Sequence, residues 1–507
     1  MPRSAALATV LAILALTFLD TTVVSVALGA IQYHLGAGVI SLQWVANGYS
    51  LPFASLMLIA GSLSDRFGRK RLMIIGIVVF CVGSVIAGVA PNVTVLIIGR
   101  AVMGVGAAAS EPGTLSVLRH LYPGRAERAR ALGAWAAVSG LALALGPVLG
   151  GVLIGLGGWR SVFWFNLALG ALLLAACVAY LPESSDPRAG RLDGGGFVLG
   201  AVGLGALIYA GISGEQYGYG TWWIVLLFAV AGVALVGCWA VEKRATNPML
   251  SLTYLHDRVV GTALFVAFAV YFGIFSIFFF TALYLDLAIG YTGWQLAGVF
   301  TPMAVTIVVG SLVAGSWVAR WGARVPLIVG CLLSAAGIML TRAIIGPNVS
   351  DRVLATVLAV AGFGFGVAVV PLTAAVLGHV RAADSGMAAG ATNTARQLGA
   401  VIGVAALGGL VNAHLTGDFG TSLSAQGVSD SQREYILGLL VTGGSGAAGF
   451  DIAHPPEVIR PLVEAAISAF RNGLHVALIV SAALIVVGAL ATALVPRSAM
   501  APSSELD

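Results

Sequence analysis

The chain has 507 residues, of which 59% are hydrophobic and only 9% carry a charged side chain, and its formal net charge is +5. A soluble domain carries about 25% charged residues, so this composition excludes a water-facing globular protein. Low charge combined with high apolarity also excludes a disordered chain. The composition therefore indicates an integral membrane protein.

Apolar runs long enough to cross a bilayer recur along the whole sequence. A helical span needs about 20 predominantly apolar residues. Asp20 interrupts the first run, which favours an uncleaved helix over a signal peptide. We expect an all-α membrane fold with fourteen spans, at 5–29, 42–62, 72–90, 93–111, 130–156, 162–181, 194–213, 221–241, 259–285, 294–318, 325–345, 353–378, 390–415 and 474–495.

The positions of the positive charges predict how these spans are oriented. If the N-terminus is cytoplasmic, 18 of the 26 Lys and Arg residues fall in cytoplasmic segments, whereas three fall in short loops on the other side. Short loops rich in Lys and Arg stay in the cytoplasm. We therefore expect a multi-pass protein of the cytoplasmic membrane with both termini in the cytoplasm.

Two pairs of similar segments indicate an internal repeat. The run Gly61–Lys70 closes the second span and Gly315–Arg324 closes the tenth, while Gly104–Pro112 is echoed by Gly364–Pro371. Paired halves that enclose a midplane cavity are typical of secondary transporters. We expect two pseudo-symmetric six-helix bundles, at 1–185 and 257–507, and a two-helix insertion at 186–256.

One long segment, 416–472, is expected on the extracellular side. It begins rich in Gly and Ser, and an amphipathic stretch near 456–472 is expected to lie on the membrane surface. A packed extracellular domain is disfavoured at this length and composition.

The sequence lacks the motifs that several other function classes require. The only lysines, Lys70 and Lys243, are each followed by Arg, so no phosphate-binding loop is present and ATP-driven transport is excluded. The four cysteines lie in apolar runs without CxxC spacing, and the seven histidines form no cluster. We expect no enzyme, no cofactor, no metal and no nucleic-acid partner.

The loop between the second and third spans carries the strongest local signal. Asp65 can pair with an Arg or face a helix N-terminus, which favours anions. Such a pair would latch the two halves in one conformation. The alternative is a basic cluster that only anchors the loop in the cytoplasm. The residues concerned are Gly61, Asp65, Arg66, Gly68, Arg69 and Lys70.

The fifth span contains a run of small residues around a proline. Gly146 and Gly150 allow close helix packing, and Gly151 extends the small face. Pro147 removes a backbone hydrogen bond and favours a kink. This helix is expected at the interface of the two halves, where it would bend or seal during transport, and simple close packing is the alternative.

Charged residues inside the spans are the candidates for coupling. An ionisable group in a span is costly and marks function by default, and burial favours the neutral form of a carboxyl group. Asp20 is the first candidate to carry a proton, with a structural ion pair to Arg100 or Arg396 as the alternative. Glu111 is the second, with a helix-end role as the alternative. Asp286 lies near a helix edge, where we expect a solvated carboxylate.

Aromatic side chains within the spans are candidates for a pocket that accepts varied cations. For any one of them, packing against lipid or core is the favoured alternative. They are Trp44, Tyr49, Trp135, Tyr271, Phe275 and Tyr284.

The order and spacing of these motifs resemble the major facilitator superfamily, in its fourteen-helix drug:proton antiporter branch. The likeness covers nearly the whole chain. Besides the 61–70 loop, it is carried by Leu19–Leu28, Arg100 with Gly104–Ala108, Gly140 with Gly146–Gly151, Trp159–Asn166, and the set Gly390, Asn393, Arg396, Gln397 and Gly399. The resemblance implies that Arg100, Asn393, Arg396 and Gln397 are charge partners or line the cavity, alongside Tyr49 and Trp135.

Three positions depart from the family pattern. Met103 stands where Gln is usual, Ala319 replaces the acidic residue of the second-half loop, and Asp286 stands where this branch usually has Gln. Any latch in the second half is therefore weaker or different, and no role is carried over to Asp286.

The resemblance implies a proton-coupled secondary exporter of amphipathic or cationic drugs from the cytoplasm. Its coupling ion is the proton, its partners are small-molecule drugs and membrane lipid, and it is expected to act as a monomer. Rival functions are a dedicated exporter of an endogenous metabolite or lipid, an importer, and a non-transporting membrane sensor or scaffold. The Gly146-Pro147 motif argues against the importer, and Asp20 argues against the sensor.

Overall fold

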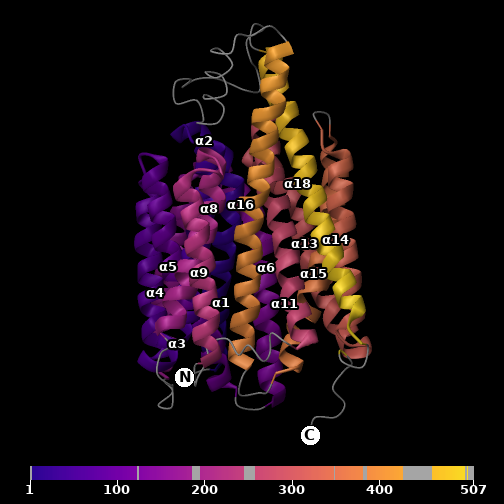
Figure 1. Cartoon of the computed structure of the whole chain (residues 1–507). Helices are drawn as coiled ribbons and strands as arrows, with labels where there is room; N and C mark the ends of the chain where they lie inside the picture. Colours follow the sequence, from indigo (N-terminus) through magenta and orange to yellow (C-terminus); the bar gives the residue numbers. More distant parts are fainter. Residues whose placement is uncertain are drawn as a thin grey trace.

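The computed structural model describes residues 3–122, 125–184, 194–244, 257–346, 349–380, 385–425, 460–496 and 500 (Figure 1). Within these ranges the regular structure is helical throughout, and most helices run side by side along one direction. The all-α fold predicted from the apolar runs is confirmed.

Eight helical segments make up the chain before residue 185. They are α1 (Arg3–Val23), η1 (Val24–Ala27), α2 (Leu28–Leu35), α3 (Val39–Phe67), α4 (Arg69–Gly88), α5 (Val93–Leu121), α6 (Arg125–Gly157) and α7 (Arg160–Tyr180). Two further helices follow, α8 (Gly194–Tyr217) and α9 (Trp222–Arg244). The remaining segments are α11 (Arg258–Ser276), η2 (Ile277–Thr281), α12 (Ala282–Leu287), α13 (Gly293–Trp321), α14 (Arg324–Ile344), α15 (Asp351–Gly378), α16 (Ser385–Ala425) and α18 (Arg460–Leu494).

Each apolar run predicted to cross the membrane coincides with one of these helices or, for 5–29 and 259–285, with three consecutive helical segments. In the described part of the chain, thirteen helices are long and apolar enough to span a bilayer. The remaining predicted run, 42–62, lies on α3. The spans at 5–29 and 259–285 are each interrupted, by the 3-10 segment η1 and the π-helical segment η2 respectively.

The helix contacts show which parts of the chain lie together. Before residue 185, α5 packs against α3 and α4, and α1 packs against α6 and α7. After residue 257, α15 packs against α13 and α14, and α11 packs against α16 and α18. The two largest interfaces between these groups are those of α6 with α13 and of α3 with α16. The helices α8 and α9 pair with each other, and α8 also touches α3 and α16.

The segment predicted as an extracellular loop is shorter than 416–472. Helix α16 continues to Ala425, and α18 already begins at Arg460. Both helices rise beyond the rest of the bundle at the end opposite the two termini (Figure 1). The expectation of a surface-lying stretch is therefore wrong for residues 460–472, because an apolar run marks where a helix crosses a membrane and not where the helix ends. Residues 426–459 lie outside the described residues.

Glycines bring several helix pairs into backbone contact. A Cβ at Gly83 of α4 would stand 2.6 Å from the backbone nitrogen of Met103 and 2.8 Å from the carbonyl oxygen of Gly99, both on α5. A Cβ at Gly106 of α5 would meet α4 in the same way. Small residues at such crossings allow the close approach by which membrane helices gain packing energy.

We expect Gly83→Ala to lower thermal stability, because the added methyl has no room between two backbones. Overpacking of this kind costs about 1–3 kcal/mol. Gly205→Ala on α8 is the matched control, since a Cβ there meets nothing within 4 Å and alanine is the better helix former. Thermal unfolding of the two purified variants in one detergent checks this. Equal melting temperatures would contradict the packing described.

Candidate functional site

Two fully buried charged residues in the first half form an ion pair. Asp20 on α1 and Arg100 on α5 are each 0% exposed, and an Arg100 Nη1 donates to Asp20 Oδ2. Removing two charges from water costs several kcal/mol each, so the pair persists only because each charge is met by the other and by further hydrogen bonds. The pairing with Arg100, one of two alternatives left open by the sequence, is the one observed.

Both members of this pair have additional partners. Asn166 of α7 donates from Nδ2 to the second oxygen of Asp20 at 2.6 Å. Arg100 donates from Nε to the carbonyl oxygen of Val45 on α3 at 3.0 Å. Its guanidinium also stands 4.5 Å from the centroid of the Tyr49 ring. Arg100 is thus held to α3 by contacts that do not depend on the charge of Asp20.

A second network of buried side-chain hydrogen bonds connects α5 to α16. Asn393 donates from Nδ2 to Glu111 Oε1 at 3.1 Å, and its own Oδ1 accepts from Arg396 at 3.3 Å. Arg396 also donates to Thr373 of α15 at 2.6 Å and stands 5.5 Å from the Tyr271 ring centroid. The structure therefore brings together Glu111, Asn393 and Arg396, which were separate candidates in the sequence.

Several buried atoms in and around this hydrogen-bond network have no hydrogen-bond partner among the described residues. They are Glu111 Oε2, Arg396 Nε, Gln397 Oε1 and the hydroxyl of Tyr271. Buried polar atoms are normally paired, so each unpaired one marks unused capacity to bind a proton, water or ligand. Trp135 is not among them, because its ring nitrogen donates to Thr114 at 3.0 Å beside Glu111.

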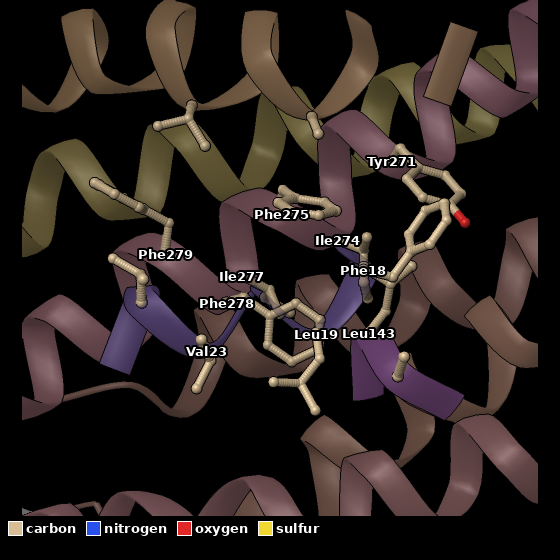
Figure 2. Packing of buried hydrophobic residues seen from close by; sticks show 14 of the residues in the cluster. Phe18, Leu19, Val23, Leu143, Tyr271, Ile274, Phe275, Ile277, Phe278 and Phe279 are labelled. Carbon is tan, nitrogen blue, oxygen red and sulfur yellow. The ribbon is translucent and has the colours of Figure 1, made fainter. Parts of the chain in front are cut away.

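A small cavity lies between α1, α3, α11 and α16. Its wall combines short polar side chains from the first half with phenylalanines from the second. It is lined by Thr21, Thr22, Val24, Ser25, Ala46, Asn47, Ser50, Phe275, Phe278, Phe279, Ala400 and Val404. Figure 2 shows Phe275, Phe278 and Phe279 in the same packed region as Leu19 and Val23.

The cavity coincides with both helix irregularities. Val24 and Ser25 belong to the 3-10 segment η1, and Phe278 and Phe279 belong to the π-helical segment η2. Such departures from α-helical geometry are frequent at functional sites and hinges. η1 and η2 also contact each other, so both spans depart from α-helical geometry where they line the same space.

Helix α6 packs tightly against both α1 and α13 through its small face. A Cβ at Gly150 would stand 2.6 Å from the carbonyl oxygen of Val23, and one at Gly151 would stand 2.7 Å from the Cβ of Ala297. A Cβ at Gly146 would meet the side chain of Thr22, whose hydroxyl donates to the carbonyl of Leu143 at 3.0 Å. Pro147 lies inside the helix between these contacts. This face is therefore filled in the conformation seen here.

The loop between α3 and α4 docks on the segment that follows α7. Gly68 has φ +109°, a left-handed value that glycine tolerates, and a Cβ there would stand 2.7 Å from Glu183 Oε1. The same oxygen accepts from the backbone nitrogen of Lys70 at 3.2 Å, at the N-terminus of α4. Lys70 Nζ donates to the carbonyl of Val178 at 2.7 Å, and Arg69 donates to Ser184 at 3.5 Å.

The carboxylate at this helix N-terminus is thus Glu183, which the sequence reading did not single out. Its signal was present in the sequence, since Glu183 follows the sixth predicted span, 162–181, directly after Pro182. Gly61, Asp65 and Arg66 fall on α3, but their side chains lie outside the described residues.

Other predicted residues are placed away from these networks. Trp44 contacts Tyr209 at a ring distance of 5.2 Å, and Tyr284 stacks on Phe470. Asp286 is partly buried, and its carboxyl group lies against Gly29. The expectation of a fully solvated carboxylate is wrong there, because α12 packs on α2.

Sequence comparisons relate the chain to known proteins. The profile of the Major Facilitator Superfamily matches residues 10–404. The multidrug resistance protein Stp of Mycobacterium tuberculosis is 34% identical over 480 residues, covering 94% of this chain and 88% of that protein. The puromycin resistance protein pur8 of Streptomyces alboniger is 35% identical, covering 83% and 84%. The probable actinorhodin transporter of Streptomyces coelicolor is 32% identical, covering 91% and 84%.

Solved structures share the same architecture. The bacterial homologue of the human lysosomal transporter Spinster, inward-facing and unoccupied, superposes with a TM-score of 0.63 at 18% identity, covering 97% of this chain and 98% of that one. The human organic anion transporter MFSD10 gives 0.59 at 16% identity, covering 97% and 100%. At these identities the likeness shows the fold alone.

We expect Glu183→Ala to lower thermal stability by about 1–2 kcal/mol, because the backbone donors of Lys70 and Ser184 lose a charged acceptor. The exposed ion pair with Arg71 adds little. Glu464→Ala, which removes an exposed carboxylate at the start of α18, is the control and should leave stability unchanged. Thermal melting of both variants measures the difference, and an unchanged Glu183→Ala would show that this docking does not stabilise the fold.

Proposed function

The chain belongs to the major facilitator superfamily, as its motifs predicted, and we propose that it exports amphipathic or cationic drugs from the cytoplasm in exchange for protons. Its family and its structural neighbours are transporters, not enzymes. Relatives that cover most of the chain bear the names multidrug resistance and puromycin resistance protein. The observation that carries the coupling proposal is the buried Asp20–Arg100 pair, since the next two residues after Asp20, Thr21 and Thr22, line the cavity.

Asp20 is the proposed proton carrier. Burial disfavours its charged form, whereas Arg100 and Asn166 favour it. Because these influences oppose each other, a rearrangement that adds water or removes Arg100 or Asn166 changes the balance between the two protonation states of the carboxyl group. Arg100 keeps Val45 and Tyr49 as partners when Asp20 is neutral. Protonation therefore weakens the attachment of α1 to α5 without leaving Arg100 unsupported.

Glu111 is the proposed second acid. It sits on α5, and its contact with Asn393 reaches α16, a helix of the other half. Its unpaired oxygen is fully buried, so a proton or a donor from a ligand would complete its bonding. A change in its protonation would alter a contact between the halves and couple proton binding to their movement.

The transport cycle we propose is a rocking motion of the halves 1–185 and 257–507 about the central cavity, with 186–256 as an insertion. The α6–α13 and α3–α16 interfaces support it, because they join the two groups of helices. The small face of α6 would open and close against α13, and the Gly68–Lys70 loop with Glu183 would hold α4 to α7. Extracellular protons would neutralise Asp20 and release the drug outside.

The substrate proposal rests on the cavity wall. Phe275, Phe278 and Phe279 offer flat apolar faces, and Asn47 and Ser50 offer hydrogen bonds without a fixed charge. Aromatic faces bind organic cations of varied shape. We propose a monomer with both termini in the cytoplasm, in contact with lipid, that needs neither ATP nor a bound cofactor.

A dedicated exporter of one endogenous metabolite is the second candidate. It is favoured by relatives named for single compounds, the probable actinorhodin transporter and the tetracenomycin C resistance and export protein of Streptomyces glaucescens, which is 31% identical. A susceptibility panel with deletion and overexpression separates the candidates, because a drug exporter changes tolerance to several unrelated compounds.

Asp20→Asn should abolish drug efflux driven by a pH gradient in vesicles, because the amide cannot release a proton. Downhill drug exchange across the same vesicles should persist, which separates loss of coupling from failure to fold. Asp286→Asn is the matched control, a second carboxyl within a span that lies against α2 and not at the ion pair, and it should retain gradient-driven efflux. Gradient-driven efflux by Asp20→Asn would refute the coupling role.

Glu111→Gln should lower the number of protons exchanged per drug without stopping export. The amide oxygen of Gln can still accept the hydrogen bond from Asn393, but the amide group cannot take up or release a proton. Simultaneous measurement of drug and proton flux gives the ratio. An unchanged ratio would assign Glu111 a structural role between α5 and α16.

A further inference from the structure

The contact between α3 and α16 continues beyond the cavity, on the side away from the two termini. Asn47 of α3 and Val404 of α16 both line the cavity. Gln43 lies one turn before Asn47 and shares its helix face, and Gly408 lies one turn after Val404 and shares its face. Helix α3 begins at Val39, shortly after α2 at the bundle end opposite the termini (Figure 1). Gln43 and Gly408 therefore lie between the cavity and that end of the bundle.

The side chain of Gln43 fills the space beside Gly408. A Cβ at Gly408 would stand 2.0 Å from Gln43 Nε2 and 2.5 Å from Gln43 Cδ. Gln43 is 0% exposed. Its carboxamide therefore packs directly on the backbone of α16, at a position where any residue larger than glycine would displace it. We call this the Gln43–Gly408 contact.

The buried carboxamide of Gln43 has no hydrogen-bond partner among the described residues. This holds for both Oε1 and Nε2, and also for Nδ2 of Asn47 one turn deeper. Buried polar atoms are normally paired. An apolar side chain of the same length would fill the space without unpaired groups, and such replacements are nearly neutral or stabilising. Filling space therefore does not account for an amide at position 43.

Helix α8 covers the same seam between α3 and α16 from outside. It contacts both helices, and its Ile208 is buried in a cluster with Ile40 of α3 and with Val401 and Ala405 of α16. These apolar side chains separate the seam from the surrounding lipid. A polar partner for Gln43 therefore reaches it from the cavity and not from the membrane.

We propose that Gln43 is a specificity-determining residue for export, which hydrogen-bonds neutral carbonyl, hydroxyl or amide groups of the drug when the Gln43–Gly408 contact opens. This inference rests on the proposed function and names part of its substrate chemistry. A carboxamide offers donors and an acceptor without a charge, so it recognises hydrogen-bonding groups and not the cationic centre. Because these bonds form only after the contact opens, they favour the open state for drugs that carry such groups.

Efflux of two organic cations from vesicles tests this inference. Puromycin carries amide and hydroxyl groups, whereas tetraphenylphosphonium has no hydrogen-bonding group. The measured quantity is the ratio of their efflux efficiencies, each the maximal rate divided by the apparent KM, so a change common to both probes cancels. Gln43→Met keeps the length of the side chain and removes the amide. Gln32→Met makes the same change on α2, away from the cavity lining, and is the control.

We expect Gln43→Met to lower the ratio of puromycin to tetraphenylphosphonium efflux about three- to tenfold, the effect of losing one hydrogen bond. Its melting temperature should equal or exceed that of wild type, because the change removes unpaired buried groups. Gln32→Met should keep the wild-type ratio.

An unchanged ratio in Gln43→Met, or an equal decrease in Gln32→Met, would overturn the inference while leaving drug export intact. A melting temperature of Gln43→Met below that of wild type would also overturn it, because the amide would then stabilise the closed contact. Failure of wild type to export either probe would refute the proposed drug export, and the inference with it.

Discussion

The buried ion pair between Asp20 and Arg100 is the constraint around which the first half of the protein is arranged. Two charges at 0% exposure are tolerable only if every strong donor and acceptor finds a partner. Asn166 of α7 satisfies one oxygen of Asp20, and Val45 and Tyr49 of α3 hold Arg100. Four helices, α1, α3, α5 and α7, therefore meet at one polar centre inside an otherwise apolar bundle. Their relative positions follow from hydrogen-bond geometry as well as from packing.

The same centre stands next to the two irregular helix segments that border the cavity. Two residues after Asp20, Thr22 bonds to α6, and the helix then changes to the 3-10 segment η1 beside the cavity. The π-helical segment η2 approaches the cavity from the other half. Glu111 reaches α16 through Asn393, so a second acid lies at a contact between the halves. A change of charge at either acid therefore alters contacts that position helices relative to one another.

Much of this arrangement follows from the sequence, and the exceptions have physical reasons. Apolar runs of membrane-spanning length predicted the helices, and the small residues at Gly146–Gly151 predicted a close approach, which α1 and α13 supply. The sequence could not predict which Arg pairs with Asp20, because Arg100 and Arg396 carry the same charge. The packing of α1 against α5 places Arg100 beside it. Glu183 was missed because its role depends on the docking of two segments far apart in sequence. The extensions of α16 and α18 were missed because hydropathy reports membrane depth, not helix length.

The central claim is that a bound drug favours the ionised form of Asp20 and a bound proton disfavours drug binding. It is tested most directly by measuring proton release when the drug binds. Purified protein in weakly buffered solution is mixed with a cationic drug at equal pH, and a pH indicator follows the protons released. If drug binding favours the ionised form of Asp20, wild type releases protons and Asp20→Asn, binding the same drug, releases fewer. Drug binding to wild type without proton release, or equal release by both proteins, would contradict the claim.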